Sequence, residues 1–275
     1  MLDKKKNGRN GASLRTRTPV DDWIVRPAPN PDARMRLFCF HYAGGSASLY
    51  QEWSQALPDD VEVCAVQLPG RGHRFVERPF NRLGHLVTAL TDVLESQLDR
   101  PFALFGYSMG ALVAFEFARE LRRRQLSAPQ HLFVAARRAP QLAPPLNHQL
   151  SGMADDELLA FLVDSGNIKM DSIAGGGTFM RMMLPTLRAD CEVAETYTHQ
   201  VEEPLDCSIS AYGGVQDPYV LEKHLQEWHA HTRHDFDLQM FEGKHFFLHN
   251  SIPSLPQNIG LHLQSAITVA ERESL

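Results

Sequence analysis

Short apolar runs recur along the chain and alternate with segments whose apolar side chains fall on one face of a helix. Runs of this length that are apolar throughout are typical of strands buried on both faces of a parallel sheet. The alternation therefore predicts the α/β class, with a mostly parallel central sheet flanked by helices. The predicted strands are Met35–Phe40, Val61–Gln67, Phe102–Phe105, His131–Ala135, Asp206–Tyr212 and Phe236–Phe241. The predicted helices span about 48–57, 82–98, 109–125, 219–231 and 253–271.

One long segment breaks this alternation. From Ala139 to about Gln200 no strand candidate occurs, although a crossover helix needs only half that length. After a Pro-rich start, amphipathic helices are expected near 155–164 and 178–197, and the segment holds Met153, Met170, Met180, Met182 and Met183. Unbranched thioether side chains adapt to ligands of varied shape, so we predict a helical lid over an apolar pocket, with Gly175–Gly177 as a flexible joint. The alternative is an extra layer of loosely packed core.

The composition is that of a soluble protein with one large domain. The chain has 275 residues, of which 43% are hydrophobic, and its net charge is −6. This charge argues against binding to nucleic acid or to an anionic membrane, because both require a net basic surface. No apolar run reaches the length of about 18 residues that a membrane span needs. Four cysteines without a CxxC pair are typical of buried free thiols, which favours a cytoplasmic protein.

Basic charge is concentrated at the N-terminus. Residues 1–18 carry six Lys and Arg side chains against one Asp, and they have no apolar stretch. A segment of this composition cannot bury enough apolar surface to fold, and it lacks the apolar core of a signal peptide. We therefore predict a disordered basic tail at 1–20, with a targeting segment as the alternative. One domain is expected to follow at 21–275, including the lid at about 139–200.

Candidate chemistry centres on a GxSxG sequence at Gly106–Gly110, between a predicted strand and a predicted helix. A nucleophilic serine at such a turn occupies a strained backbone, so small residues must flank it on both sides. Its Oγ also lies at the N-terminus of the following helix, where the dipole favours developing negative charge. Ser108 is therefore the candidate nucleophile. The alternative is a tight glycine turn in which Ser108 only caps the helix.

A serine nucleophile needs a base and an acid, and in this architecture the acid precedes the histidine along the chain. His245 lies in the loop directly after the last predicted strand and is the candidate base. His249 is interpreted as a solvated or capping histidine at the start of the closing helix. Asp217 follows the strand before the penultimate helix and is the candidate acid, with Pro218 starting that helix. The alternative role of Asp217 is a helix N-cap.

An oxyanion hole needs two backbone N–H donors aimed at the reacting carbonyl oxygen. One is expected from Met109, directly after the nucleophile, and the other from the loop 41–46 after the first predicted strand. The alternative for this loop is an ordinary glycine turn, and Ser46 within it lacks the strand-to-helix context of a nucleophile. No metal is expected, because neither HExxH nor a carboxylate spacing accompanies the histidines at 229, 231 and 234.

Four regions together resemble the type II thioesterases that accompany polyketide and nonribosomal peptide synthetases, within the α/β-hydrolase fold. They are 37–47 (LFCFHYAGGSA), 67–74 (QLPGRGHR), 105–111 (FGYSMGA), and 212–217 (YGGVQD) with 243–248 (GKHFFL). The resemblance covers about residues 22–268 and rests on all of them occurring in order. It implies Ser108 as nucleophile, His245 as base, Asp217 as orienting acid, and the amides of Ala43 and Met109 as oxyanion donors. The sequence departs at His41, where family members usually have proline, and this puts the Ala43 donor in question.

The resemblance implies hydrolysis of acyl groups from the phosphopantetheine arm of an acyl or peptidyl carrier protein, which clears aberrant or stalled chains. No cofactor is expected, since phosphopantetheine belongs to the substrate, and we expect a monomer. Carrier proteins are usually acidic, so an acidic enzyme needs a local basic rim to dock one; the hypothesis is that Arg71, Arg74, Arg78 and Arg82 supply it. The alternatives are a medium-chain thioesterase of fatty acid synthesis, a general carboxylesterase, and a non-catalytic ligand-binding member of the fold.

Overall fold

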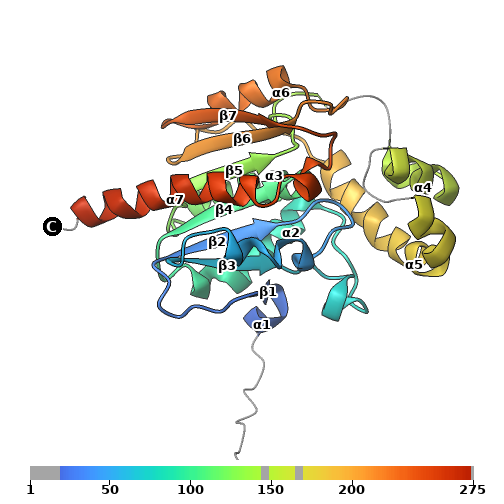
Figure 1. The fold of residues 1–275 in the computed structure, drawn as a ribbon, viewed down its shortest axis with the longest axis horizontal. Coiled ribbons are helices and arrows are strands. Elements are labelled where there is room, and N and C mark those ends of the chain that lie inside the picture. Colours follow the sequence, from blue (N-terminus) through green and yellow to red (C-terminus); the bar gives the residue numbers. More distant parts are fainter. Residues whose placement is uncertain (1–18, 144–148, 165–169, 274–275) are drawn as a thin grey trace, which may run out of the picture.

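A seven-stranded sheet forms the centre of the molecule (Figure 1). The computed structural model describes residues 19–143, 149–164 and 170–273. The strand order is β1-β3-β2-β4-β5-β6-β7, and all neighbours are parallel except β1, which pairs antiparallel with β3. The strands are β1 (Ile24–Val25), β2 (Met35–Phe40), β3 (Val61–Val66), β4 (Phe102–Tyr107), β5 (His131–Ala135), β6 (Ser208–Gly214) and β7 (Phe236–Phe241). The predicted α/β class with a mostly parallel sheet is confirmed.

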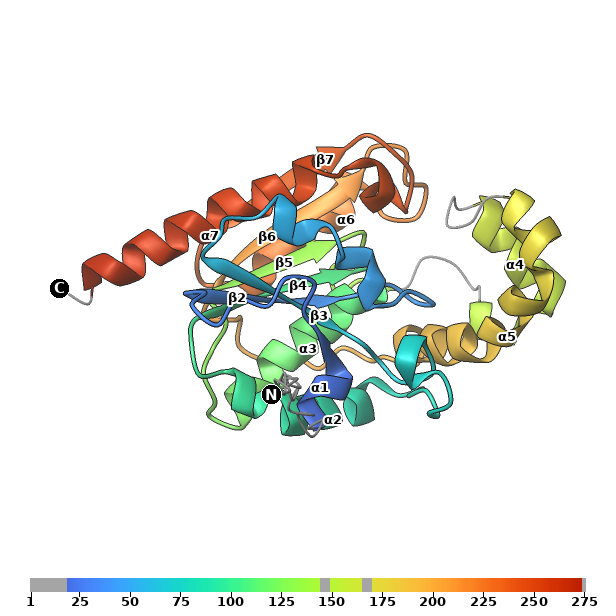
Figure 2. The same cartoon turned by 60° about the horizontal axis from the view of Figure 1, so that its bottom comes forward.

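Helices cover both faces of the sheet because the central strands are apolar on both sides (Figures 1 and 2). In β2, Phe38 and Phe40 belong to the core beneath α2 and α3, whereas Leu37 and Cys39 belong to the core beneath α7. All four side chains are at most 2% exposed. The helices outside the lid segment are α1 (Pro19–Trp23), α2 (Leu83–Leu94), α3 (Met109–Arg123), α6 (Glu222–Gln226) and α7 (Ser254–Glu273).

Two predicted helices are shorter or tighter than expected. The segment 48–57 forms two 3-10 turns, Ala47–Tyr50 and Trp53–Gln55, which place Tyr50 and Trp53 in the core at a spacing of three residues. Pro218 does not start a helix, since α6 begins only at Glu222 and is continued by a 3-10 turn to His231.

The segment predicted as a lid forms two helices, α4 (Asp155–Asp164) and α5 (Met170–Glu195), which lie beyond one end of the sheet (Figures 1 and 2). Gly175–Gly177 lie inside α5, so the expected joint is a helical segment; the break in the hydrogen-bond pattern of α5 is instead at Pro185. Apolar side chains from both helices form a small core of their own. Its buried members are Leu158, Leu159, Leu162, Leu184, Leu187 and Cys191.

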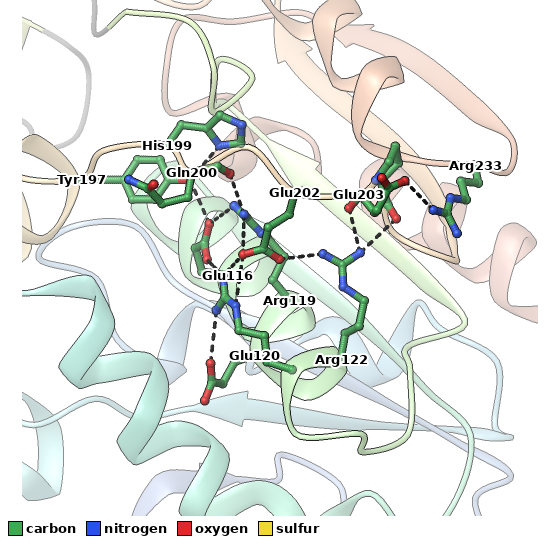
Figure 3. Close-up of polar contacts among 12 residues, drawn as sticks. Glu116, Arg119, Glu120, Arg122, Tyr197, His199, Gln200, Glu202, Glu203 and Arg233 are labelled. Atoms are coloured by element: carbon green, nitrogen blue, oxygen red, sulfur yellow. Dashed lines mark hydrogen bonds and ion pairs between the residues drawn. The ribbon is translucent and has the colours of Figure 1, made fainter.

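After α5 the chain returns across the end of α3, where a network of charged side chains holds it (Figure 3). Arg119 of α3 is 2% exposed and donates to the Glu116 carboxylate and to the Gln200 carbonyl, both at 2.6 Å. Glu202 accepts from Arg119 at 2.7 Å and also pairs with Arg122 and Arg123, which follow on α3. The chain that follows α5 is therefore tied to the helix that follows the GxSxG turn.

Further expectations concern the termini, the cysteines and the membrane. Of the predicted tail, residues 1–18 lie outside the described residues, while Pro19 and Val20 already belong to α1. The four cysteines are free and buried, as predicted, and burial raises the pKa of Cys64 and of Cys207 to about 12. Within the described ranges, none of the helices has both the length and the apolar character that crossing a membrane would require.

Candidate active site

Ser108 lies at the sharp turn between β4 and α3. Its backbone has φ 54° and ψ −112°, a region that residues other than glycine rarely occupy, and its N–H donates to the Ala135 carbonyl at 2.8 Å. A Cβ at Gly106 would lie 2.2 Å from the Gly110 carbonyl oxygen, and one at Gly110 would lie 2.2 Å from that of Phe40. Only glycine therefore fits on either side. Ser108 precedes α3, but its side chain makes no capping hydrogen bond.

Ser108, His245 and Asp217 form a continuous chain of hydrogen bonds. The His245 Nε2 atom is 3.1 Å from Ser108 Oγ, and its Nδ1 atom is 2.7 Å from Asp217 Oδ2. Because a carboxylate only accepts, the ring proton lies on Nδ1, and Nε2 accepts from the serine hydroxyl. The three residues follow β4, β7 and β6, so the carboxyl ends of parallel strands bring them together.

Asp217 uses its two carboxylate oxygens for different partners. The side chain is fully buried, with Oδ2 on His245, while Oδ1 accepts the N–H groups of Tyr219 at 2.8 Å and Val220 at 3.1 Å. The two roles considered for this residue, partner of the histidine and local cap, are thus filled by different oxygens. The cap contacts fix the direction in which the second oxygen points.

Tyr107, directly before the serine, holds the loop that carries His245. Its hydroxyl donates to the His245 carbonyl at 2.6 Å and accepts from the Leu248 N–H at 3.3 Å. Burial raises the pKa of Tyr107 well above its ordinary value, so the hydroxyl keeps the proton it donates. The loop is also joined to the Asp217 loop, because the Gln216 N–H donates to the Gly243 carbonyl at 2.9 Å. The sequence does not indicate this role, because Tyr107 lies beyond the predicted strand Phe102–Phe105 and its partners are 138 and 141 positions away.

The loop after β2 forms a tight turn at Tyr42–Gly45. The Gly45 N–H donates to the Tyr42 carbonyl at 2.9 Å, and Gly44 has φ +77°, which favours glycine. The Gly44 N–H donates to the Asp190 carboxylate of α5 at 2.8 Å. Ala43, the predicted oxyanion donor, lies at the tip of this turn and is half-buried. The second predicted donor, Met109, is the first residue of α3, so its N–H has no carbonyl partner within that helix.

Two histidines near this turn are neutral neighbours of it. His41 is 1% exposed and donates from Nδ1 to the Tyr42 carbonyl at 2.8 Å. Burial, with a smaller contribution from Arg71, lowers the pKa of His41 to about 4, so the ring adds no charge at neutral pH. His249 lies in a 3-10 turn before α7 and contacts the Tyr42 hydroxyl at 3.2 Å, instead of starting the closing helix. Burial lowers its pKa as well.

The expectation that Arg71 and Arg74 belong to an exposed basic rim is wrong. Arg71 is 1% exposed and donates to both carboxylate oxygens of Asp190, at 2.6 and 2.8 Å. Arg74 is 6% exposed and donates to Glu77 at 2.6 and 2.8 Å. Neither guanidinium is available to a partner protein, because each is buried and is bound by a carboxylate of the same chain. Of the four arginines expected in the rim, Arg78 and Arg82 are exposed.

The three clustered histidines each contact a different residue. Their ring nitrogens lie within 2.5 to 2.8 Å of Gln226, Gln141 and Asp206, for His229, His231 and His234 respectively. Within the described part of the chain, no group of three or more His, Cys, Asp or Glu side chains is placed to hold a metal ion.

A comparison with known proteins connects this geometry to a family. The family model of the thioesterase domain matches residues 35–260. This range includes Ser108, Asp217 and His245, which the hydrogen bonds described above connect. The chain belongs to the thioesterase domain family. The resemblance inferred from the sequence is thereby confirmed, and with it the α/β-hydrolase type of fold.

Individual relatives match most of the chain. This chain is 40% identical to the protein named linear gramicidin dehydrogenase LgrE of Brevibacillus parabrevis, over 91% of its own length and 96% of that of the relative. Thioesterase PikA5 of Streptomyces venezuelae is 37% identical over 88% of this chain and 85% of its own. Among solved structures, the RedJ thioesterase of the prodiginine pathway in Streptomyces coelicolor superposes with a TM-score of 0.78 at 38% identity, covering 88% of this chain and 96% of that one.

The fatty acid alternative is less well supported. The medium-chain S-acyl fatty acid synthase thioesterase of Rattus norvegicus is 30% identical over 80% of this chain and 83% of its own. That similarity lies below the 37 to 40% found with the bacterial relatives and with RedJ. One relative carries the name of a dehydrogenase, whereas the family, PikA5 and RedJ are all named as thioesterases.

Proposed function

We propose that this enzyme is a type II thioesterase that hydrolyses acyl groups from the phosphopantetheine arm of acyl or peptidyl carrier proteins. The observation that carries the proposal is the Ser108–His245–Asp217 chain, with hydrogen bonds of 3.1 and 2.7 Å, in a member of the thioesterase family. The arm is part of the substrate, so the enzyme needs no cofactor of its own. One chain supplies all three residues, which supports action as a monomer, and the four buried thiols support a cytoplasmic location.

The first half of the reaction transfers the acyl group to the enzyme. Ser108 Oγ attacks the thioester carbonyl while His245 Nε2 takes its proton, and the Asp217 carboxylate stabilises the imidazolium that forms. The carbonyl oxygen becomes an oxyanion, which the N–H groups of Ala43 and Met109 stabilise. When the tetrahedral intermediate collapses, the C–S bond breaks and the arm leaves as a thiol with the proton from His245.

The second half releases the product. Water takes the position of the departed thiol, and His245 removes one of its protons as the water oxygen attacks the acyl-serine carbonyl. The same two amides stabilise the second oxyanion. Collapse of this intermediate returns the proton to Ser108 Oγ and releases a free acid. Each proton transfer uses the same Nε2 atom, so the ring orientation that Asp217 maintains serves both halves.

We propose that α4 and α5 act as a lid over this site. Phe161 of α4 packs on Tyr219 with ring centroids 5.9 Å apart, and Tyr219 in turn lies 6.4 Å from the His245 ring. This aromatic path connects the insertion to the proposed base. A segment in this position would exclude water while the acyl-enzyme forms and would contact the acyl chain.

The test is to incubate the protein with acyl-loaded carrier protein and to follow loss of the acyl group by intact mass, with an oxygen ester of the same acyl group in parallel. Deacylation that is faster than ester cleavage and is absent in Ser108→Ala is expected. Ser46→Ala is the control, because Ser46 is the other candidate serine and its hydroxyl contacts only Ser48 Oγ in the structure described, at 2.7 Å. Cleavage of the ester with a carrier that stays loaded would favour a general carboxylesterase. No cleavage of either would favour a non-catalytic binding protein.

A further inference from the structure

A buried ion pair connects α5 to the turn that carries Ala43. Arg71 and Asp190 are 1% and 2% exposed, and two parallel hydrogen bonds of 2.6 and 2.8 Å join their side chains. Desolvating two charges is costly, so a pair at this depth is maintained only with good geometry and further hydrogen bonds. Arg71 Nε donates to the Pro69 carbonyl at 3.2 Å, and the other further hydrogen bonds are made to the turn Tyr42–Gly45.

The pair holds two consecutive residues of this turn directly after Ala43. Asp190 Oδ2 accepts the Gly44 N–H at 2.8 Å, and the Arg71 guanidinium donates to the Gly45 carbonyl at 3.3 Å. The hydrogen bond between the Gly45 N–H and the Tyr42 carbonyl closes the turn but does not fix the direction in which the turn points. Glycine, here at φ +77°, restricts the backbone little, so contacts from outside the turn contribute to setting that direction. His41 holds the Tyr42 end of the turn, and the ion pair holds the end that follows Ala43.

Packing against α5 adds to the charge contact. A Cβ at Gly44 would lie 3.1 Å from the Leu187 side chain, one helical turn before Asp190, so the turn is seated directly on the helix. We infer that Asp190 and Arg71 are positioning residues for the oxyanion hole: they orient the Ala43 N–H, and the hole is complete only while this part of α5 is seated. The inference rests on the proposed function, because it assigns a role within that reaction.

A positioning role affects the transition state more than the bound substrate. An oxyanion donor acts only when its N–H lies about 2.7–3.1 Å from the developing charge, and the complete loss of one donor costs about 10²- to 10³-fold in kcat. A misoriented donor should therefore lower kcat about 10- to 100-fold. KM should change by less than about threefold, since the interaction is made in the transition state.

The decisive variant removes both charges together. Replacing a buried ion pair by apolar residues of similar volume is often neutral for stability, so Arg71→Met with Asp190→Leu is expected to remain folded and to melt cooperatively. Its kcat on a small acyl thioester should fall by the stated factor at nearly constant KM. A boronic acid that forms a tetrahedral adduct on Ser108 should bind more weakly by a similar factor. Asp190→Asn, which keeps an acceptor for Gly44 but removes the counter-charge of Arg71 and one of its two hydrogen bonds, provides a second comparison.

Thr186→Val is the matched control. Thr186 is 5% exposed on the same helix, one turn before Asp190, and its hydroxyl donates to the Gly70 carbonyl at 2.9 Å without touching the turn that carries Ala43. Its kcat should stay within about twofold of the parent.

The inference would be overturned if the folded double variant kept its kcat, if KM rose while kcat stayed constant, or if Thr186→Val lost as much kcat. A parent enzyme without thioester turnover, or turnover that survives Ser108→Ala, would instead overturn the proposed function.

Discussion

The division of labour within the Asp217 carboxylate makes its substitution informative. In Asp217→Asn an amide NH₂ group must face either His245 Nδ1 or the backbone N–H groups of Tyr219 and Val220, and both arrangements place donor against donor. The ring can escape by moving its proton to Nε2, which then no longer accepts from Ser108. We expect kcat on an acyl thioester to fall about 10⁴-fold. Unchanged circular dichroism would show that the fold persists, and a loss below tenfold would contradict the role of Asp217.

Because the His131 ring is buried, we expect the free energy of unfolding to fall in mild acid. The ring contacts Ser210 Oγ at 2.8 Å, stacks on Phe133, and has its pKa lowered to about 3 by burial and by His262. The unfolded chain therefore binds a proton below about pH 6.5 that the folded chain refuses until about pH 3, and stability falls as the pH drops through this window. At pH 5 we expect this to lower the free energy of unfolding by about 2 kcal/mol.

The measurement is urea unfolding at pH 7 and pH 5. His131→Gln keeps hydrogen-bonding groups at this position without a titrating ring, so its free energy of unfolding should fall by about 2 kcal/mol less than that of the parent over this interval. Parallel pH dependences for the two proteins would show that His131 is not the group responsible.

At the scale of elements, the network that ties the chain after α5 to α3 contains neighbouring glutamates with different surroundings (Figure 3). Glu202 accepts from the buried Arg119, and although burial raises its pKa, the hydrogen bonds from the arginines lower it to about 2. Glu203 pairs at 2.6 Å with Arg233, and both of these side chains are exposed. Glu202→Gln should lower the free energy of unfolding by about 1–3 kcal/mol, whereas Glu203→Gln should change it by less than about 1 kcal/mol. Equal effects in urea unfolding would contradict this account.

Elements whose pattern is local were predictable from the sequence. β2, β5 and β7 begin and end where their apolar runs do. The two-residue strand β1 was missed because it is too short to show any periodicity and is defined only by its pairing with β3. The prediction that a helix starts at Pro218 was wrong because the backbone after it first turns around the Asp217 carboxylate, and α6 begins only at Glu222.

Some residues of the candidate site have a local signal in the sequence, and others do not. Ser108 could be located because its turn requires glycines within two residues on either side, and Asp217 and His245 because each follows a strand. Arg71 was assigned to the surface because its partner Asp190 is 119 positions away, and no local pattern indicates that pairing. An acidic residue among the apolar positions of an amphipathic helix is the signal that could have pointed to it.

At the scale of the whole molecule, an enzyme of net charge −6 needs a favourable local surface if, as proposed, its substrate is attached to an acidic carrier protein. With Arg71 and Arg74 buried, the exposed part of the proposed docking region is narrower than expected. Arg78 is exposed and follows Phe75 and Val76, which are 38% and 94% exposed. Arg82 is also exposed but pairs with Glu192 at 3.0 Å, so its charge is partly neutralised. Arg78 is therefore the arginine of the original four that best fits a carrier contact.

Arg78→Glu should raise KM for acyl-loaded carrier protein about 3- to 10-fold and leave KM for a small acyl thioester unchanged, because only the carrier reaches this surface. The difference should shrink at high ionic strength, where contacts between exposed charges are screened. Lys223→Glu makes the same charge change on α6, beside β6 and far along the sheet from β3, and should leave both KM values unaltered. If Arg78→Glu raised both KM values equally, its effect would lie in the acyl site, and if it raised neither, the carrier would dock elsewhere.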